Sequence, residues 1–311
     1  MRQRLMLAGV LGGLAGVVLA TGASAAPLPG PNNAYWAGNR LYYAAGYGKT
    51  NNLVVNTVGA YVTTFDDTTS IVPGEGCSRP SAADPTVVIC VEPTGLSGNK
   101  FLSIGLNDLN DSLEIRGQLY YNEITGGSGN DTIRLLANSG YYNIVYGNAG
   151  NDVLERAESV GFDRLLGGTG ADTMCSPGGV VSYEDHPTAV VADIGGAAGN
   201  DGSPGEGDTI CGSIRALFGS PFNDVLRAGV ALKVGLYGRA GTDQLFGSTG
   251  NDILWGDDGA DTLSAGAGAD HLTGGTGADS LNGGTDADEC RIGPSDVSII
   301  SCDTTVSDSD D

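Results

Sequence analysis

The sequence predicts an all-β solenoid, and the repeat pattern of residues 238–291 carries that prediction. These residues divide into six consecutive units of nine, from GRAGTDQLF to GGTDADECR. Glycines early in each unit supply tight turns, and the last three residues alternate outward, inward and outward as in a short strand. One unit cannot bury its single inward side chain alone. The units must therefore stack on one another to form a core.

The phase of the repeat places one aspartate and one apolar residue in every unit. The sixth-place aspartates are Asp243, Asp252, Asp261, Asp270, Asp279 and Asp288. The inward residues two places later are Leu245, Leu254, Leu263, Leu272, Leu281 and Cys290. If two units form one coil, residues eighteen apart lie above one another at a strand spacing of about 4.8 Å. We therefore expect the aspartates to form two columns, one on each edge of the coil.

Stacked carboxylates at this spacing need a counter-ion. Two of them repel by about 3.5 kcal/mol if the effective dielectric constant is near 20. Carboxylate oxygens and turn carbonyl oxygens, without thiolate or imidazole, favour a hard cation such as Ca²⁺.

The units resemble the RTX, or hemolysin-type calcium-binding, nonapeptide GGxGxDxUx. The resemblance implies a parallel β-roll or β-helix solenoid with Ca²⁺ bound between successive turns. It also implies that the six aspartates are calcium ligands, together with backbone carbonyls of the glycine turns. In the last unit, Asp286 replaces the fourth-place glycine and Cys290 replaces the inward leucine, so we expect this unit to form a cap.

The same phase recurs in patches upstream, beginning near Asp111. Three further aspartates in this region are candidate calcium ligands: Asp131, Asp152 and Asp172. The half-coils between them carry Asn122, Asn143 and Asp163 in the equivalent places, with Ile124, Val145 and Leu165 predicted to point inward. A spacing of about 20 residues per coil predicts a more general β-helix here.

The chain divides into segments of different composition. An N-terminal run with Arg2 and Arg4, an apolar middle and Ala23-Ser24-Ala25 is typical of a cleaved secretory signal. The expected order is a signal peptide at 1–25, a β-rich capping segment at 26–93, degenerate coils at 94–237 with an enlarged loop at 177–212, the regular array at 238–291, and a C-terminal cap with a disordered acidic tail at 292–311. Within the enlarged loop, Asp208-Thr209-Ile210 imitates the end of a repeat.

Six cysteines lie downstream of the predicted signal, as expected in an oxidising compartment. They allow fifteen pairings, but they fall into neighbouring couples that we predict to be the disulfides: Cys77 with Cys90, Cys175 with Cys211, and Cys290 with Cys302. Zinc binding is not expected, because no C-x-x-C occurs and both histidines, His186 and His271, lie far from any cysteine couple.

A formal charge of −22 argues against nucleic acid or an anionic membrane as a partner, and no later segment could span a bilayer. No H-E-x-x-H or G-x-S-x-G motif occurs, and His186 is expected to be a solvated loop histidine. We therefore expect a secreted, extracellular, non-enzymatic protein that folds or stiffens on binding Ca²⁺.

Two alternatives stay open at this stage. The first is a calcium-dependent adhesion or matrix protein with a glycan or protein partner. Its binding face would be the aromatic cluster of Tyr35, Trp36, Tyr42, Tyr43 and Tyr47. The second is a polysaccharide-acting enzyme with active carboxylates between Asp111 and Asp172.

Overall fold

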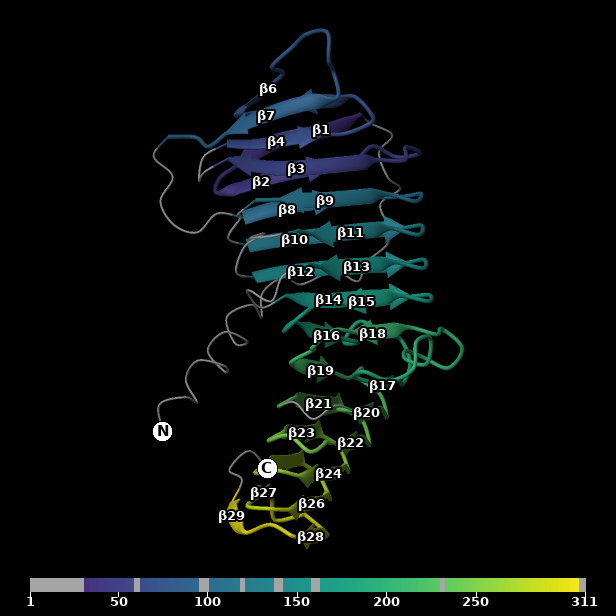
Figure 1. Cartoon of the computed structure of the whole chain (residues 1–311), viewed down its shortest axis with the longest axis vertical. Coiled ribbons are helices and arrows are strands. Elements are labelled where there is room, and N and C mark those ends of the chain that lie inside the picture. The colour runs from purple at the N-terminus through teal and green to yellow at the C-terminus, as the bar shows by residue number, and fades with distance from the viewer. Residues whose placement is uncertain are drawn as a thin grey trace.

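The computed structural model describes residues 31–58, 62–94, 101–117, 121–136, 142–157, 163–229 and 233–307. These residues form strands that wind into one column, with the coils stacked along its long axis (Figure 1). The predicted all-β parallel solenoid is therefore confirmed. The predicted signal peptide at 1–25 lies outside the described residues. In the part of the chain that the structure describes, no helix has the length and apolar character needed to cross a membrane.

One sheet of 14 strands, here called the long sheet, runs the whole length of the column. In order along the sheet its strands are β5 (Ile71–Pro73), β1 (Asn32–Ala37), β2 (Arg40–Ala44), β8 (Phe101–Gly105), β10 (Tyr121–Ser128), β12 (Tyr142–Ala149), β14 (Arg164–Thr169), β16 (Val180–Ser182), β19 (Ala216–Phe218), β21 (Gly235–Ala240), β23 (Ile253–Asp258), β25 (His271–Thr276), β27 (Glu289–Ile292) and β29 (Thr304–Ser307).

Two shorter sheets complete the coils. The N-terminal sheet of nine strands comprises β6 (Cys77–Ser78), β7 (Val87–Val91), β4 (Val62–Asp66), β3 (Asn52–Val58), β9 (Ser112–Arg116), β11 (Thr132–Leu135), β13 (Val153–Arg156), β15 (Thr173–Cys175) and β18 (Thr209–Cys211). The C-terminal sheet of six strands comprises β17 (Val191–Asp193), β20 (Val225–Arg227), β22 (Gln244–Phe246), β24 (Thr262–Ala267), β26 (Ser280–Thr285) and β28 (Ser298–Ile300).

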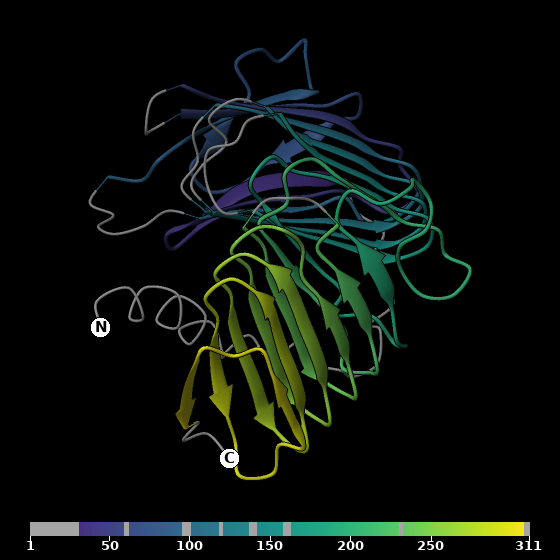
Figure 2. The same ribbon diagram turned by 60° about the horizontal axis from the view of Figure 1, so that its bottom comes forward.

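Coil length differs between the two halves of the column. In the regular array Leu263 pairs with Leu281 one coil on, an advance of 18 residues that equals two nonapeptides. Upstream, Thr132 pairs with Val153, and the advance is 20 or 21 residues. The C-terminal coils are accordingly narrower than the N-terminal ones (Figure 2). The predicted change from a tight roll to a wider helix is therefore found.

The core is a stack of inward side chains, with one or two from most strands of each coil. The inward residues predicted from the sequence are all at most 1% exposed: Ile124, Val145, Leu165, Leu245, Leu254, Leu263, Leu272, Leu281 and Cys290. Burying a side chain of this size stabilises a fold by about 1.5–3 kcal/mol. Because each leucine contacts mainly the coils above and below, this energy is gained only when the coils stack.

The N-terminal end of the column is closed by antiparallel strands. β1 pairs with β2, β3 with β4, and β4 with β7 in antiparallel register, and then β2 and β3 pair in parallel with β8 and β9 of the first coil. Trp36, Tyr43 and Phe65 are buried beneath these strands. The tyrosine-, valine- and threonine-rich composition of this segment therefore serves strand pairing and a local core, and it covers the edge of the stack.

The three predicted disulfides are present. Cys77 is bonded to Cys90, Cys175 to Cys211, and Cys290 to Cys302. The prediction of a disordered acidic tail is wrong for residues 304–307, because β29 adds to the long sheet beside β27 in parallel register. Residues 308–311 lie outside the described residues. The Cys290 bond ties the last repeat to the segment that leads into β29.

At the enlarged loop, residues 177–212, the sheet that completes the coils beside the long sheet changes from the N-terminal sheet to the C-terminal sheet. The chain leaves β16 of the long sheet, forms β17 of the C-terminal sheet, and then returns to β18 of the N-terminal sheet. The N-terminal sheet ends at β18 and the C-terminal sheet begins at β17. This coil protrudes from the column at the level of β18 (Figure 1).

We expect Leu263→Ala to lower the free energy of unfolding by about 2–5 kcal/mol, because it removes a fully buried side chain from the middle of the stack. Thr262→Ala, which changes the exposed neighbour on the same strand, should cost far less. Urea denaturation in saturating Ca²⁺ measures both. Equal effects of the two substitutions would show that the leucine stack does not hold the coils together.

Candidate metal site

The aspartates of the repeats form three ladders along the edges of the column, each member one or two residues before a strand. The first ladder, before N-terminal-sheet strands, consists of Asp111, Asp131, Asp152, Asp172 and Asp208. The second, before C-terminal-sheet strands, consists of Asp224, Asp243, Asp261, Asp279 and Asp296. The third, before long-sheet strands, consists of Asp252, Asp270, Asp288 and Asp303. Hydrogen bonds between aspartates of successive coils define the three ladders.

A single hydrogen bond repeats along each ladder. The main-chain N–H of one aspartate donates to Oδ1 of the aspartate one coil on, at 2.7–2.9 Å, as from Asp243 to Asp261 and from Asp252 to Asp270. The stacking predicted from the eighteen-residue spacing is therefore found. All nine aspartates named as candidate ligands belong to a ladder, and each is at most 1% exposed.

The other carboxylate oxygen, Oδ2, has no hydrogen-bond partner in much of the described ladder. This holds for Asp111, Asp131, Asp152, Asp172, Asp208, Asp243, Asp261, Asp270 and Asp288. Asp252 differs, because Ser248 donates both its main-chain N–H and its hydroxyl to Oδ2. A buried charged oxygen without a partner is costly. These oxygens therefore face a space where a cation would satisfy them.

Glycines leave room for the oxygens to converge. A Cβ added to Gly256 would lie 2.3 Å from Oδ2 of Asp261 and 2.4 Å from the carbonyl oxygen of Gly274 in the next coil. A Cβ at Gly147 would lie 2.4 Å from both Asp152 Oδ2 and the Gly167 carbonyl oxygen. Only glycine therefore permits a carboxylate and a carbonyl from adjacent coils to face each other. This all-oxygen donor set fits Ca²⁺, which takes 6–8 oxygen ligands.

Burial makes the ladder carboxylates reluctant to ionise without a partner. It raises the pKa of Asp152, Asp172 and Asp243 to about 7, and that of Asp261 and Asp270 to about 6. The hydrogen bond from the preceding coil lowers each pKa in part, and neighbouring ladder carboxylates raise it. Near neutral pH the ladders must therefore either retain protons or bind cations.

The opposite edge of the N-terminal half is built differently. Asn122 donates its side-chain amide to Asn143, and Asn143 donates to Asp163. The stack ends at Arg156, whose guanidinium forms a buried ion pair with Asp163. Amide and guanidinium groups therefore supply here the partners that the aspartate ladders lack.

Two ladder members, Asp296 and Asp303, were not recognised in the sequence. They follow the preceding aspartates by 17 and 15 residues rather than 18, so they fall out of the repeat phase. The signal that could have found Asp296 is Ile299, which pairs with Leu281 in the register of the earlier repeats. Asp208 ends the first ladder, and Asp224 begins the second.

The expectation that His186 is a solvated loop residue is wrong. Its side chain is buried, and the ring lies edge-on against Tyr183 at 4.7 Å between centroids. Nε2 lies 3.3 Å from Glu206 Oε2, and Nδ1 lies 3.5 Å from Asp185 Oδ1. Glu206 is 20 residues from His186 in the sequence, so their contact could not be predicted from the sequence. His271, in contrast, is exposed on the outer face beside Glu289.

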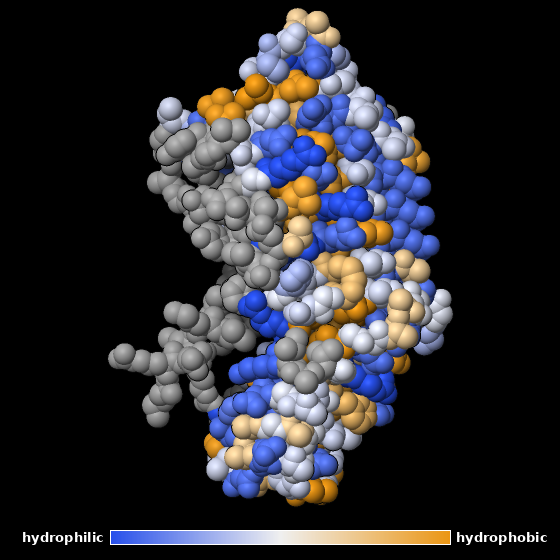
Figure 3. Space-filling view, in the orientation of Figure 1, coloured by the Kyte–Doolittle hydropathy of each residue, from blue (hydrophilic) through white to orange (hydrophobic). Residues whose placement is uncertain are grey.

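The N-terminal aromatic cluster divides between the core and the surface. Trp36 and Tyr43 are buried, whereas Tyr35 and Tyr42 face outward on paired strands and stack with ring centroids 5.2 Å apart. Tyr47 is also exposed. On the face in Figure 3, small apolar areas are scattered among hydrophilic side chains.

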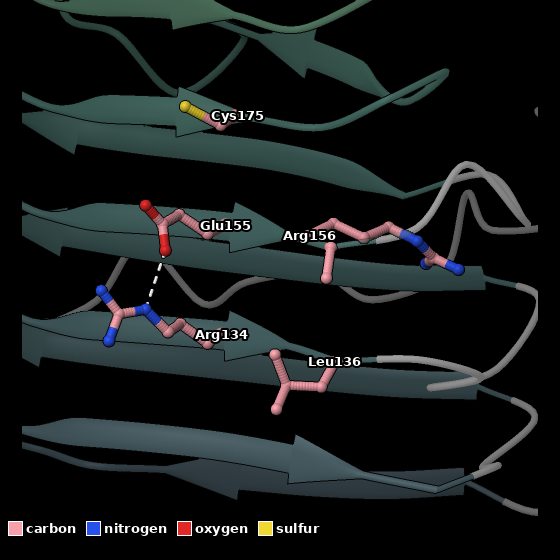
Figure 4. Close-up of a pocket in the computed structure, with 6 residues that line it drawn as sticks. Arg134, Leu136, Glu155, Arg156 and Cys175 are labelled. Atoms are coloured by element: carbon pink, nitrogen blue, oxygen red, sulfur yellow. Dashed lines mark hydrogen bonds and ion pairs between the residues drawn. The ribbon is translucent and has the colours of Figure 1, made fainter.

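One shallow surface pocket lies over the N-terminal sheet. Figure 4 shows Arg134 and Glu155 joined by an ion pair across neighbouring coils, with Leu136 beside them and Arg156 turned away from the pair. The ion-pair distance is 2.8 Å. Cys175, which also lines the pocket, is bonded to Cys211. The charged side chains here pair with each other across the sheet.

The fold and ladders define a class of protein: a parallel β-solenoid with carboxylates stacked for binding cations between its coils. A family model described as the RTX calcium-binding nonapeptide repeat, in four copies, matches residues 114–137, 139–155, 159–176, 237–272 and 255–290. These stretches therefore carry RTX calcium-binding repeats, as the resemblance implied, and they lie in the stacked coils of the parallel β-roll. A search among curated proteins gave no match.

We predict that pH acts on stability with opposite sign in the absence and presence of Ca²⁺. The ladder pKa values lie above the ordinary aspartate value, so the metal-free folded state binds more protons than the unfolded state between about pH 4 and pH 7. Metal-free protein should therefore gain stability as the pH falls from about 8 to about 5.5.

With saturating Ca²⁺ the ladder carboxylates must be ionised to bind the metal, so the same acidification should lower stability. Thermal unfolding followed by circular dichroism measures both series. Parallel pH profiles with and without Ca²⁺ would contradict a link between the ladders and the metal.

Proposed function

We propose that this is a secreted, non-enzymatic protein whose column folds or stiffens when Ca²⁺ fills the aspartate ladders outside the cell. The observation that carries the proposal is the row of buried Oδ2 atoms without hydrogen-bond partners, repeated from coil to coil. The proposed ligands are the sixth-place aspartates of the regular array together with Asp131, Asp152 and Asp172. Asp111 and Asp224 extend the proposal, because they occupy equivalent ladder positions.

Coupling between folding and ion binding follows from the balance of energies. The glycine-rich turns lose much conformational entropy on ordering, and the ladders bring like charges together. A cation that binds only the coiled state stabilises it by about 2.7 kcal/mol for each site when its concentration is a hundredfold above Kd. Several such sites along one column would decide whether the coils form.

Secretion is supported by the signal-like N-terminus and by the three disulfides. Disulfides persist in oxidising compartments, and extracellular Ca²⁺ is abundant compared with that of the cytosol. A chain exported before it meets Ca²⁺ would order only after export.

A non-enzymatic role is supported by where the carboxylates lie. The aspartates Asp111, Asp131, Asp152 and Asp172 are buried in the first ladder, each bonded to a neighbouring coil, and so are poorly placed to reach a polysaccharide. The more exposed glutamates of this region, Glu114, Glu123 and Glu155, form ion pairs with arginines. The proposal would be overturned if the purified protein degraded uronans or other acidic polysaccharides.

Calcium titration of chelator-treated protein, followed by far-UV circular dichroism, tests the proposal. We expect a cooperative gain of β signal with Ca²⁺ and little gain with Mg²⁺, which demands a tighter octahedral site. The variant Asp252→Asn/Asp270→Asn should shift the transition to higher Ca²⁺ concentration, because it removes two adjacent ladder charges without changing shape.

A matched control is Asp258→Asn/Asp286→Asn, which removes two charges from exposed positions of the same array. It should titrate like the unmodified protein. A β spectrum that is complete without Ca²⁺ would overturn coupled folding. Equal shifts in the two double variants would overturn the ladder assignment.

A second candidate function is calcium-dependent binding of glycans. The outward stacked pair of Tyr35 and Tyr42 favours it, with the Arg40 guanidinium 6.0 Å from the Tyr42 ring centroid, because exposed aromatic rings pack against sugar rings. Binding to a glycan array that is lost in Tyr42→Ala and kept in Tyr47→Ala would support this function. No binding on a broad array would exclude the Tyr35 and Tyr42 pair as a glycan site.

A further inference from the structure

The enlarged coil gathers a cluster of metal-ligating side chains that differs in chemistry from the ladders. His186, from the segment after β16, meets Glu206 and Asp208, from the segment before β18. One ligand atom from each residue lies within 4.8 Å of those of the other two. The cluster therefore joins two parts of the coil that are separated along the chain by strand β17 and its following loop.

The imidazole is buried and lacks a hydrogen bond. The His186 side chain has no exposed surface, and neither ring nitrogen has a hydrogen-bond partner among the described residues. Its Nε2 lies 3.3 Å from Glu206 Oε2, and a carboxylate oxygen of the buried Asp208 lies within 4.8 Å. A buried donor or acceptor without a partner costs about 1–3 kcal/mol, so this arrangement calls for a ligand.

The surroundings are those that a metal-bound histidine needs. Asp185 Oδ1 lies 3.5 Å from Nδ1, the nitrogen opposite the cluster, and a carboxylate there fixes the ring tautomer and raises ligand basicity. The edge of Tyr183 packs against the ring. The main-chain N–H of Ser203 donates to Glu206 Oε2 at 2.7 Å and holds the carboxylate toward the histidine.

We propose that His186 Nε2, Glu206 and Asp208 Oδ2 form a site for a divalent transition-metal ion of the zinc class, separate in selectivity from the calcium ladders. Zinc binds imidazole nitrogen and carboxylate oxygen, whereas Ca²⁺ takes oxygen ligands. Zinc ligand atoms at about 2.0–2.1 Å from the metal lie closer together than this cluster does, so the half-buried Glu206 must rotate slightly inward.

The place of the site in the fold gives it a structural role. Asp208 is the last member of the first ladder, and the N-terminal sheet ends with the strand that follows it. The metal would join the end of that ladder to the segment after β16, in the coil where the N-terminal sheet gives way to the C-terminal sheet. It would therefore fix the junction between the two halves of the column.

Zinc titration in saturating Ca²⁺ tests the site with the ladders already filled. Isothermal calorimetry of the purified chain should show one Zn²⁺ bound that excess Ca²⁺ does not displace. His186→Gln should abolish this binding, and Asp185→Asn should weaken it by about 10- to 100-fold. The matched control is His271→Gln, which removes the other histidine of the chain, an exposed one, and should bind Zn²⁺ like the unmodified protein.

A second measurement needs no substitution and so does not depend on how a variant folds. In protein with ¹⁵N-labelled histidine, Zn²⁺ should shift the Nε2 resonance of one imidazole, that of His186, and leave the other unchanged. The proposal is overturned if Ca²⁺-saturated protein binds no Zn²⁺, if His186→Gln binds it unchanged, or if the shifted imidazole is that of His271. It is also overturned if the His186 ring responds to pH as an imidazolium paired with Glu206 and ignores the metal.

Discussion

Burial of stacked carboxylates is the constraint on which the rest of the column depends. Each ladder aspartate uses one oxygen to accept an N–H from the preceding coil, which fixes the register of the stack. In much of the ladders the same burial leaves the other oxygen facing a carbonyl of the next coil with no proton donor. The hydrogen bond that aligns the coils thus brings unpaired carboxylate oxygens together, and in the proposed function a cation neutralises them as the coils align.

Glycine and leucine serve this arrangement in different ways. Glycines such as Gly256 are needed because a side chain would fill the space between a carboxylate and a carbonyl. The leucines supply apolar contact, but each coil offers only one or two of them, so the core is thin. The N-terminal half has wider coils, and an edge where Asn143, Asp163 and Arg156 neutralise one another. That half therefore presents one aspartate ladder for ions, whereas the regular array presents two.

The regular array was the most predictable part of the molecule, because a strict period fixes both the inward leucines and the stacking of Asp243 on Asp261. The ladder members after the array were harder to predict, because Asp296 and Asp303 follow the preceding aspartates by fewer than 18 residues. His186 could not be placed from sequence, because its contact with Glu206 depends on how the enlarged coil folds back. Such non-periodic contacts leave no local signal. The strand at 304–307 was missed because it lies within the acidic stretch 303–311, whose composition is typical of a solvated tail.

The most direct test of the central claim is anomalous X-ray diffraction at long wavelength from crystals grown with Ca²⁺. The account predicts calcium peaks between successive coils, in contact with the Oδ2 atoms of ladder aspartates such as Asp261 and with carbonyl oxygens of the glycine turns. Those peaks should repeat at each coil of the regular array. A map without peaks along the ladders, with the same oxygens bonded to water or protein instead, would contradict the account.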